Sequence, residues 1–300
     1  MDVVISGSTG LIGTALVDAL VAGGHRPIRL VRRAAVGDEI TWDPSAGTID
    51  AASLEGVDAL VHLAGAGIGD KRWTAAYKRT VLDSRVQGTG LLARTLAGLD
   101  RKPKALISGS AIGYYGDRGD EELTETSTPG TGFLAEVCWA WEAATQPAVD
   151  AGIRVCTLRT GIVLSTKGGA LRKQLPLFRL GLGGRFGNGR QWQSWISIDD
   201  EVGAIIHALG SELRGPVNLT APTPVTNADF ATVLGHALHR PSFLPIPAFG
   251  PKLLLGGEMA DALLFTGQKV RPTALIADGF AFTQPTLAEA LATLLARRAT

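Results

Sequence analysis

The sequence has few cysteines, no long apolar run and no excess of charge of either sign. Its two cysteines, Cys138 and Cys156, are too few for a disulfide framework, and neither has a thiol or histidine nearby at metal-ligand spacing. No apolar run is long enough to span a membrane. The net charge is +1, and the basic residues form no stripe of the kind that binds nucleic acid. We therefore expect no bound metal, no membrane and no nucleic-acid partner.

The composition is otherwise that of a globular protein with a large core. Hydrophobic residues make up 45% of the 300 residues, enough for one large domain or two closely packed ones. The sequence opens directly on an apolar run, which leaves no room for a signal peptide. We therefore expect a reducing, cytoplasmic compartment.

Residues 3–13 are the most informative segment present. A β-branched run leads there into three glycines spaced three apart, which predicts a strand, a tight turn and a helix. Such a turn aims backbone N–H groups and the positive end of a helix at a pyrophosphate. An ordinary strand-to-helix turn is the alternative. The predicted cofactor contacts are Gly7, which permits the turn, Gly10, which lets a phosphate approach, Gly13, which lets helix and strand touch, and Ser8, Thr9, Leu11 and Ile12 between them.

The end of the next predicted strand, at residues 27–31, favours NADP(H) over NAD(H). An NAD site usually has an acidic residue there for the ribose 2′-hydroxyl, whereas arginine accommodates a 2′-phosphate. Here Arg32 and Arg33 follow the strand, and the first acidic residues beyond are Asp38 and Glu39. A guanidinium fork matches a phosphate group. We predict that both arginines bind NADP(H); two solvated arginines are the alternative.

Apolar strand-like runs alternate with helical patterns in the first half of the chain. Runs at residues 59–64, 105–108 and 154–159 are separated by predicted helices at 72–99 and 134–150. Continuous apolar strands joined by helices predict a parallel sheet covered on both faces, which binds ligands at the carboxyl ends of its strands. We predict an α/β fold, a doubly wound, Rossmann-like parallel sheet with a small, mainly helical C-terminal cap.

The pattern changes after residue 165. The predicted division is a Rossmann domain over residues 1–165 with return elements at 195–220, and a cap region over 166–194 and 221–300. Residues 181–190 form a glycine-rich loop, next to which Trp192 and Trp195 either line a substrate pocket or anchor the loop on the core. Arg185 and Arg190 are candidates to bind an anionic substrate, and the acidic run at 117–125 is interpreted as a solvated loop.

Four segments match one family pattern in the same order. After the glycine motif, residues 85–92 are similar to an Asn-Val-x-Gly-Thr-x-x-Leu-Leu helix, with Arg85 in place of asparagine. Residues 108–116 resemble a serine-rich strand end followed by Val-Tyr-Gly, and residues 195–200 resemble Phe-Ile-His-Val-Asp-Asp. Together the segments resemble the extended branch of the short-chain dehydrogenase/reductase superfamily, which includes nucleotide-sugar epimerases.

Further segments narrow this resemblance, at residues 63–68, 133–134, 141–144, 181–184 and 279–287. They resemble the atypical "epimerase family protein" group, which has a C-terminal domain of unknown function. The resemblance implies an NADP(H) site and a small-molecule substrate that it does not identify; a homo-dimer is one expected assembly. The cofactor-binding residues so implied beside the glycine loop are Arg32, Arg33, Leu63, Ala64, Gly65, Arg85, Ser108 and Ile162.

The acid–base motif Tyr-x-x-x-Lys of this superfamily is missing. In that motif the lysine lowers the pKa of the tyrosine, which then exchanges a proton with the substrate. The three tyrosines of this chain are followed, four residues later, by Val81, Arg118 and Gly119. The helix that should carry the motif instead reads Phe133-Leu134-Ala135-Glu136-Val137.

Three interpretations remain open. The first, which we prefer, is an NADP(H)-dependent oxidoreductase or epimerase-like enzyme acting on an unidentified small molecule. In it Ser110, or Ser108, binds the substrate oxygen and Tyr114 or Tyr115 supplies the proton, with simple packing as the alternative for either tyrosine. The second is an NADP(H)-binding protein without turnover that reports the cofactor's redox state to a partner. The third is a scaffold that the cofactor only stabilises.

Overall fold

The structure is a computed structural model that describes residues 1–296. Its centre is an eight-stranded sheet in the order β12-β8-β6-β5-β1-β2-β3-β4. Neighbouring strands pair in parallel except β3 and β4, which pair antiparallel. The strands of this sheet are β1 (Asp2–Ser6), β2 (Arg26–Val31), β3 (Ile40–Asp43), β4 (Thr48–Ile49), β5 (Ala59–His62), β6 (Ala105–Ala111), β8 (Arg154–Thr160) and β12 (Gly215–Leu219).

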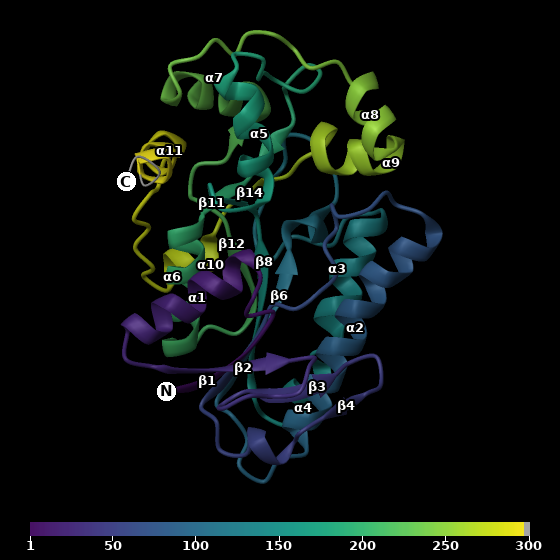
Figure 1. Cartoon of the computed structure of the whole chain (residues 1–300), viewed down its shortest axis with the longest axis vertical. Helices are drawn as coiled ribbons and strands as arrows, with labels where there is room; N and C mark the ends of the chain where they lie inside the picture. The colour runs from purple at the N-terminus through teal and green to yellow at the C-terminus, as the bar shows by residue number, and fades with distance from the viewer. Residues whose placement is uncertain (297–300) are drawn as a thin grey trace.

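Helices cover both faces of this sheet (Figure 1). Successive side chains of a strand point to opposite faces, so each central strand contributes to two cores. In β5, Ala59 and Val61 belong to one core and Leu60 to the other. This is the doubly wound α/β arrangement that the sequence predicts. The helices are α1 (Leu11–Ala22) and α6 (Ile198–Gly210) on the first face, and α2 (Ala75–Ala97), α3 (Phe133–Ala143) and α4 (Gln146–Asp150) on the second.

The later part of the chain adds mainly helices, most of them above the carboxyl ends of the strands in Figure 1. Helix α7 begins with a capping box, in which the side chains of Thr226 and Asp229 each accept a hydrogen bond from the other's backbone N–H. The separate cap domain over residues 166–194 and 221–300 stays a prediction. Besides α6, the helices after residue 165 are α5 (Gly169–Arg179), α7 (Asn227–Ala237), α8 (Phe249–Leu255), α9 (Gly257–Ala260), η3 (Asp261–Phe265), α10 (Thr273–Ala277) and α11 (Leu287–Ala296).

Short strand pairs join segments that are far apart in the sequence. They hold the loops over the sheet in place, because each pair fixes backbone groups of two distant segments. The pairs are β7 (Glu122–Leu123) with β14 (Lys269–Val270), β9 (Ile162–Leu164) with β11 (Trp195–Ser197), and β10 (Trp192–Gln193) with β13 (Val225–Thr226).

The helix predicted over residues 134–150 is in fact two helices, α3 and α4. Helix α3 ends at Ala143, and α4 starts at Gln146 with Pro147 in its first turn. A proline has no N–H to continue the hydrogen-bond ladder of a preceding helix, but it fits the first turn of a new one. The hydroxyl of Thr145 donates to the carbonyl of Glu142 at 2.7 Å, which gives one of the last carbonyl groups of α3 a hydrogen-bond partner.

The two tryptophans beside the glycine-rich loop differ in position. Trp195 is completely buried, and its indole N–H donates to the carbonyl of Thr223 at 3.1 Å. Trp195 is therefore an anchor, and its interpretation as a pocket-lining residue was wrong. Trp192 is half-buried, and its indole N–H donates to Asp120 at 2.7 Å.

Loop 181–190 is tied to the segment that follows α7. The N–H of Gly187 donates to the carbonyl of Ile246 at 3.0 Å, and the N–H of Ile246 donates to the carbonyl of Arg185 at 2.8 Å. The side chain of Asn227 accepts from the N–H of Phe186 at 2.7 Å. These contacts give the loop a defined path despite its glycine content.

The acidic run at residues 117–125 is only partly a solvated loop. Glu125, at its end, is half-buried and accepts from the backbone N–H groups of Asn218 and Ala274, each at 3.1 Å. It also accepts from the hydroxyl of Thr273, the first residue of α10. Its carboxylate thus caps α10 and joins it to β12, a role that the interpretation as a solvated loop missed.

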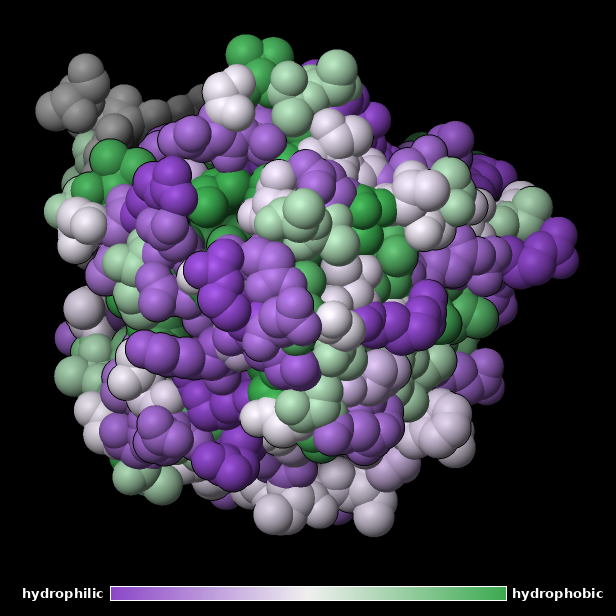
Figure 2. All heavy atoms as spheres, turned by 90° about the horizontal axis from the view of Figure 1, so that it is seen from below, coloured by the Kyte–Doolittle hydropathy of each residue, from purple (hydrophilic) through white to green (hydrophobic). Residues whose placement is uncertain are grey.

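No helix within residues 1–296 is both long and apolar enough to cross a membrane. The same residues contain no cluster of three or more potential metal ligands. Cys138 and Cys156 are buried free thiols. Figure 2 shows the lower end of the molecule, near α4 and β4, as mostly hydrophilic with scattered hydrophobic residues.

Candidate functional site

The turn after β1 has a backbone path that only glycines permit. Gly7 has a φ of +70°, and its carbonyl accepts from the N–H of Gly10 at 3.0 Å. A Cβ on Gly7 would lie 2.8 Å from the carbonyl carbon of Leu63. A Cβ on Gly13 would lie 2.2 Å from the carbonyl oxygen of Gly7, far inside van der Waals contact. The glycines therefore bring the start of α1 directly against the ends of β1 and β5.

The first turn of α1 offers a site for a phosphate group. Its N-cap, Gly10, provides no side-chain hydrogen bond, and the turn contains no acidic residue. The first amides of a helix have no partner within the helix and carry the positive end of its dipole. Thr9 and Gly10 are exposed, and Leu11 and Ile12 are half-buried. These features fit the pyrophosphate of a dinucleotide, which uncapped helix amides bind well.

The two arginines after β2 are in different environments. Both are exposed, but Arg33 forms two hydrogen bonds of 2.6 Å with the carboxylate of Glu39. The hydrogen bond from Arg33 is the largest cause that lowers the pKa of Glu39. Within residues 1–296, Arg32 forms no ion pair. Arg32 is therefore the more available guanidinium for a 2′-phosphate.

A further cation lies beside the end of β5. Arg85 is half-buried, and its Nη1 donates to the carbonyls of Ala66 at 2.9 Å and Val81 at 3.1 Å. Its guanidinium carbon lies 4.9 Å from the centre of the Trp141 ring. Burial lowers the pKa of Arg85, and no carboxylate within residues 1–296 pairs with it. Gly65 leaves room for it, since a Cβ there would lie 3.3 Å from the Arg85 guanidinium carbon.

The remaining predicted cofactor residues line the same edge at different depths. Leu63 and Ala64 follow β5, and their backbone N–H groups donate to the hydroxyl of Ser6 at 3.2 and 3.4 Å. Ser108 is completely buried in β6. Ile162 is half-buried in β9, where it is paired with Trp195 of β11.

Ser110, at the end of β6, belongs to a buried ionic network. Its hydroxyl donates to Oε1 of Glu142 at 2.7 Å. Arg159 of β8 donates to both carboxylate oxygens of Glu142, each at 2.8 Å. Arg159 is 3% exposed and Ser110 5% exposed. A bidentate pair with this little solvent fixes the carboxylate in one orientation, and with it the serine hydroxyl.

The two tyrosines both contact Arg159 but differ in burial. Tyr115 is fully buried; its hydroxyl donates to Oδ1 of Asn218 at 2.6 Å and accepts from Arg159 at 3.0 Å. Burial raises the pKa of Tyr115 to about 12. Tyr114 is half-buried, and its ring centre lies 3.4 Å from the guanidinium carbon of Arg159. Tyr114 is thus the more accessible of the two candidate proton donors, and the catalytic roles of both stay predictions.

No acid–base pair replaces the missing motif at the start of α3. Phe133 packs edge-on against Trp73, with ring centres 5.0 Å apart, and lies 4.8 Å from the ammonium of Lys78. Val137 is 3% exposed and belongs to the interior. The polar groups whose role comes nearest to that of the missing acid–base pair are therefore Ser110 and its partners Glu142 and Arg159.

Glu142 and Arg159 are the site residues that the sequence did not identify. They lie on α3 and β8, and neither has a local pattern that distinguishes it from a solvated charge. Glu142 occurs within the segment 141–144 that carried the family resemblance, but the resemblance gave it no role. Only their contact at the end of β6 shows their importance.

Comparison with known proteins agrees with this geometry. Residues 3–219 match the NAD dependent epimerase/dehydratase family, and residues 246–294 match a domain of unknown function. An epimerase family protein of Mycobacterium bovis is 47% identical over 291 residues, which cover 96% of each chain. The human epimerase family protein SDR39U1 is 38% identical over 300 residues, which cover 99% of this chain and 100% of the human one.

Solved structures give the same assignment. The crystal structure of human SDR39U1 (isoform 2) with NADPH superimposes with a TM-score of 0.91 at 37% identity, covering 98% of this chain and 99% of that one. A nucleoside-diphosphate sugar epimerase from Corynebacterium glutamicum superimposes with a TM-score of 0.80 at 39% identity, covering 98% of this chain and 58% of that one. With both the sheet and the C-terminal helices matched, the chain belongs to the NAD dependent epimerase/dehydratase family, among the atypical epimerase family proteins that carry a C-terminal domain of unknown function.

Proposed function

We propose that this protein binds NADP(H) and acts as an oxidoreductase or epimerase-like enzyme on a small molecule. The observation that carries the proposal is the uncapped first turn of α1, held by glycines at the same sheet edge as Ser110. The crystal structure of the human relative with NADPH supports this choice of cofactor. When bound, NADPH supplies a hydride from its nicotinamide ring.

The residues of this chain have distinct tasks in the proposal. The amides at the start of α1 hold the pyrophosphate, Arg32 binds the 2′-phosphate, and Arg85 adds a positive charge at the end of β5. When substrate binds, the Ser110 hydroxyl turns its single proton from Glu142 to the substrate oxygen, and Tyr114 supplies the proton for the reaction. Glu142 and Arg159 position both groups, because Glu142 accepts from Ser110 and Arg159 stacks on Tyr114.

The preference for NADPH over NADH tests whether Arg32 and Arg33 bind the 2′-phosphate. We expect the Arg32→Ala/Arg33→Ala variant to bind NADPH about tenfold to a hundredfold more weakly, with little change for NADH, because charged hydrogen bonds to the phosphate are worth about 1.5–3 kcal/mol each. Arg32→Ala alone should cause most of the loss, since Arg33 already pairs with Glu39. Titration of intrinsic fluorescence with each nucleotide measures the effect.

The matched control is Arg101→Ala, which removes an exposed arginine paired with Glu55 and should leave both affinities unchanged. An equal loss for NADPH and NADH in the double variant would show that the arginines do not read the 2′-phosphate.

Turnover tests the chemistry. We expect NADPH oxidation with at least one member of a panel of carbonyl compounds and nucleotide sugars. Ser110→Ala should lower kcat/KM about a hundredfold, because it removes the donor to the substrate oxygen, and Tyr114→Phe should lower it by a similar factor.

Tyr77→Phe is the control, since the hydroxyl of Tyr77 donates to the carbonyl of Gly67 at 2.6 Å, outside the Ser110 network. Undiminished turnover in both site variants would refute these roles. The Tyr115→Phe variant tests the other candidate proton donor in the same assay.

A second function, sensing of the redox state of the cofactor without turnover, is favoured by two observations. Phe133 and Val137 provide no acid–base group where the family normally has one, and Tyr115 is buried with its hydroxyl occupied. A sensor would bind NADPH, give no turnover over the panel, and change its affinity for a partner protein with the redox state of the cofactor.

A further inference from the structure

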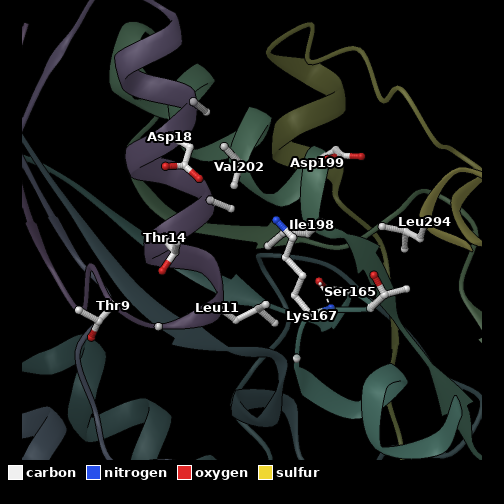
Figure 3. A pocket seen from close by; sticks show the side chains of 15 residues that line it. Thr9, Leu11, Thr14, Asp18, Ser165, Lys167, Ile198, Asp199, Val202 and Leu294 are labelled. Carbon is white, nitrogen blue, oxygen red and sulfur yellow. Dashed lines mark hydrogen bonds between the residues drawn. The ribbon is translucent and has the colours of Figure 1, made fainter. Parts of the chain in front are cut away.

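A cavity of about 680 Å³ opens on the side of α1, and Ser110 and Tyr114 are not among the residues that line it. Its walls come from α1, from the loop at residues 165–168, from the start of α6 and from Leu294 of α11 (Figure 3). We propose that this cavity binds a zwitterion with an apolar body, of the size and class of a dipeptide. Because the cavity is separate from the Ser110 network, the proposal does not depend on the proposed function.

The charges in the cavity favour a ligand with one positive and one negative group. The side chains of Lys167 and Asp18 both extend into it from opposite walls (Figure 3). Within residues 1–296 neither takes part in an ion pair. A ligand with only a negative charge would be attracted by Lys167 but repelled by Asp18, and a cation would meet the reverse. A zwitterion satisfies both side chains.

The third charged residue at the cavity has a contact of its own. Asp199, in the first turn of α6, accepts from the side-chain amide of Gln284 at 3.0 Å. We therefore assign Lys167 to the carboxylate of the ligand and Asp18 to the ammonium group of the ligand.

Much of the remaining cavity wall is apolar. Ile198, Val202 and Leu294 are each less than 10% exposed and present hydrocarbon to the cavity, together with Leu11. Pockets of about 300–1,000 Å³ are typical of sites that enclose a small organic ligand. A single amino acid would leave much of this volume to water, whereas a dipeptide with two aliphatic side chains would cover the wall.

The cavity adjoins the proposed cofactor site without coinciding with it. Thr9, Gly10 and Leu11 belong to both: the backbone N–H of Leu11 lies in the uncapped turn, while its side chain lines the cavity. The loop at residues 165–168 packs closely against the start of α1, since a Cβ on Gly168 would lie 3.1 Å from the Leu11 side chain. Both sites can therefore be filled together.

The test compares three ligands on the unmodified protein by isothermal titration calorimetry. The probes are L-leucyl-L-leucine, its N-acetyl derivative, which lacks the positive charge, and its C-terminal amide, which lacks the negative one. We expect the dipeptide to bind about tenfold or more tightly than either derivative, because each derivative loses one charged hydrogen-bonded contact. Binding should persist in saturating NADPH.

Two variants assign the contacts. Lys167→Met should weaken the dipeptide about tenfold and leave the C-terminal amide unaffected, whereas Asp18→Asn should weaken the dipeptide and leave the N-acetyl derivative unaffected. Both residues are exposed, so both variants should fold, and Lys104→Met and Asp100→Asn are matched controls at exposed positions outside the cavity. Equal binding of the three probes, absence of binding, indifference to both variants, or displacement by NADPH would each overturn the proposal.

Discussion

Replacing Glu142 by glutamine is expected to lower the free energy of unfolding by about 3–5 kcal/mol, since that is the cost of leaving a buried charge without its partner. Arg159 is 3% exposed and donates to both oxygens of the Glu142 carboxylate. A neutral amide offers one acceptor and no compensating charge, so the guanidinium remains desolvated. The same substitution removes the acceptor of the Ser110 hydroxyl. Urea denaturation followed by circular dichroism measures the change in stability.

The control for this prediction is Glu258→Gln. Glu258 pairs with Lys78 at 2.5 Å, but its side chain is 55% exposed, so its loss should cost less than about 1 kcal/mol. The Glu142→Leu/Arg159→Met double variant, which removes both charges, should recover much of the lost stability. A Glu142→Gln variant no less stable than Glu258→Gln would contradict the view that this ion pair holds α3 against β8.

Replacing Gly13 by alanine is expected to remove most NADPH binding and to cost about 2 kcal/mol of stability. The new Cβ would lie 2.2 Å from the carbonyl oxygen of Gly7 and 2.8 Å from the Cα of Ser8. Both are backbone atoms, so the clash is relieved only if α1 moves away from the turn, which is an overpacking cost. Because the first amides of α1 move with it, the Kd for NADPH should rise about tenfold or more.

Gly210→Ala is the matched control. Gly210 ends α6, and a Cβ there would meet no atom within 4 Å. Its replacement should be neutral or slightly stabilising, because alanine favours a helix more than glycine does. A Gly13→Ala variant that bound NADPH with the affinity of the unmodified protein would show that the glycine turn is not the pyrophosphate site.

Several features were predictable because they depend on residues close together in the chain. The strand, turn and helix of residues 3–13 follow from one glycine pattern, and the alternation of apolar runs predicted the central strands. The sequence predicts no element over residues 34–58, although this segment contains β3 and β4, and Trp42 of β3 is buried. Strands of four and two residues are too short for their periodicity to stand out.

The same limit applies to the charged residues. Arg33 and Glu39 were both noted, but only the fold of the chain between them brings their side chains within 2.6 Å. Glu125 has the pattern of a solvated acidic run, but the N–H of Ala274 and the hydroxyl of Thr273, in α10 about 150 residues later, donate to its carboxylate. A single charge has no signature of burial, because whether it is paired depends on a partner elsewhere in the sequence.

By itself, then, the sequence determined the doubly wound sheet, the glycine turn at its edge and the absence of a Tyr-x-x-x-Lys pair. These are set by local conformational limits and by side-chain periodicity, which need no knowledge of distant contacts. Only the tertiary structure decided that Ser110 is held by Glu142, which Arg159 fixes in turn, that the Tyr115 hydroxyl is occupied by Asn218 and Arg159, and that Lys167 faces Asp18 across a cavity. Each of these joins segments far apart in the chain, and such contacts form only when the packing of the whole core brings those segments together.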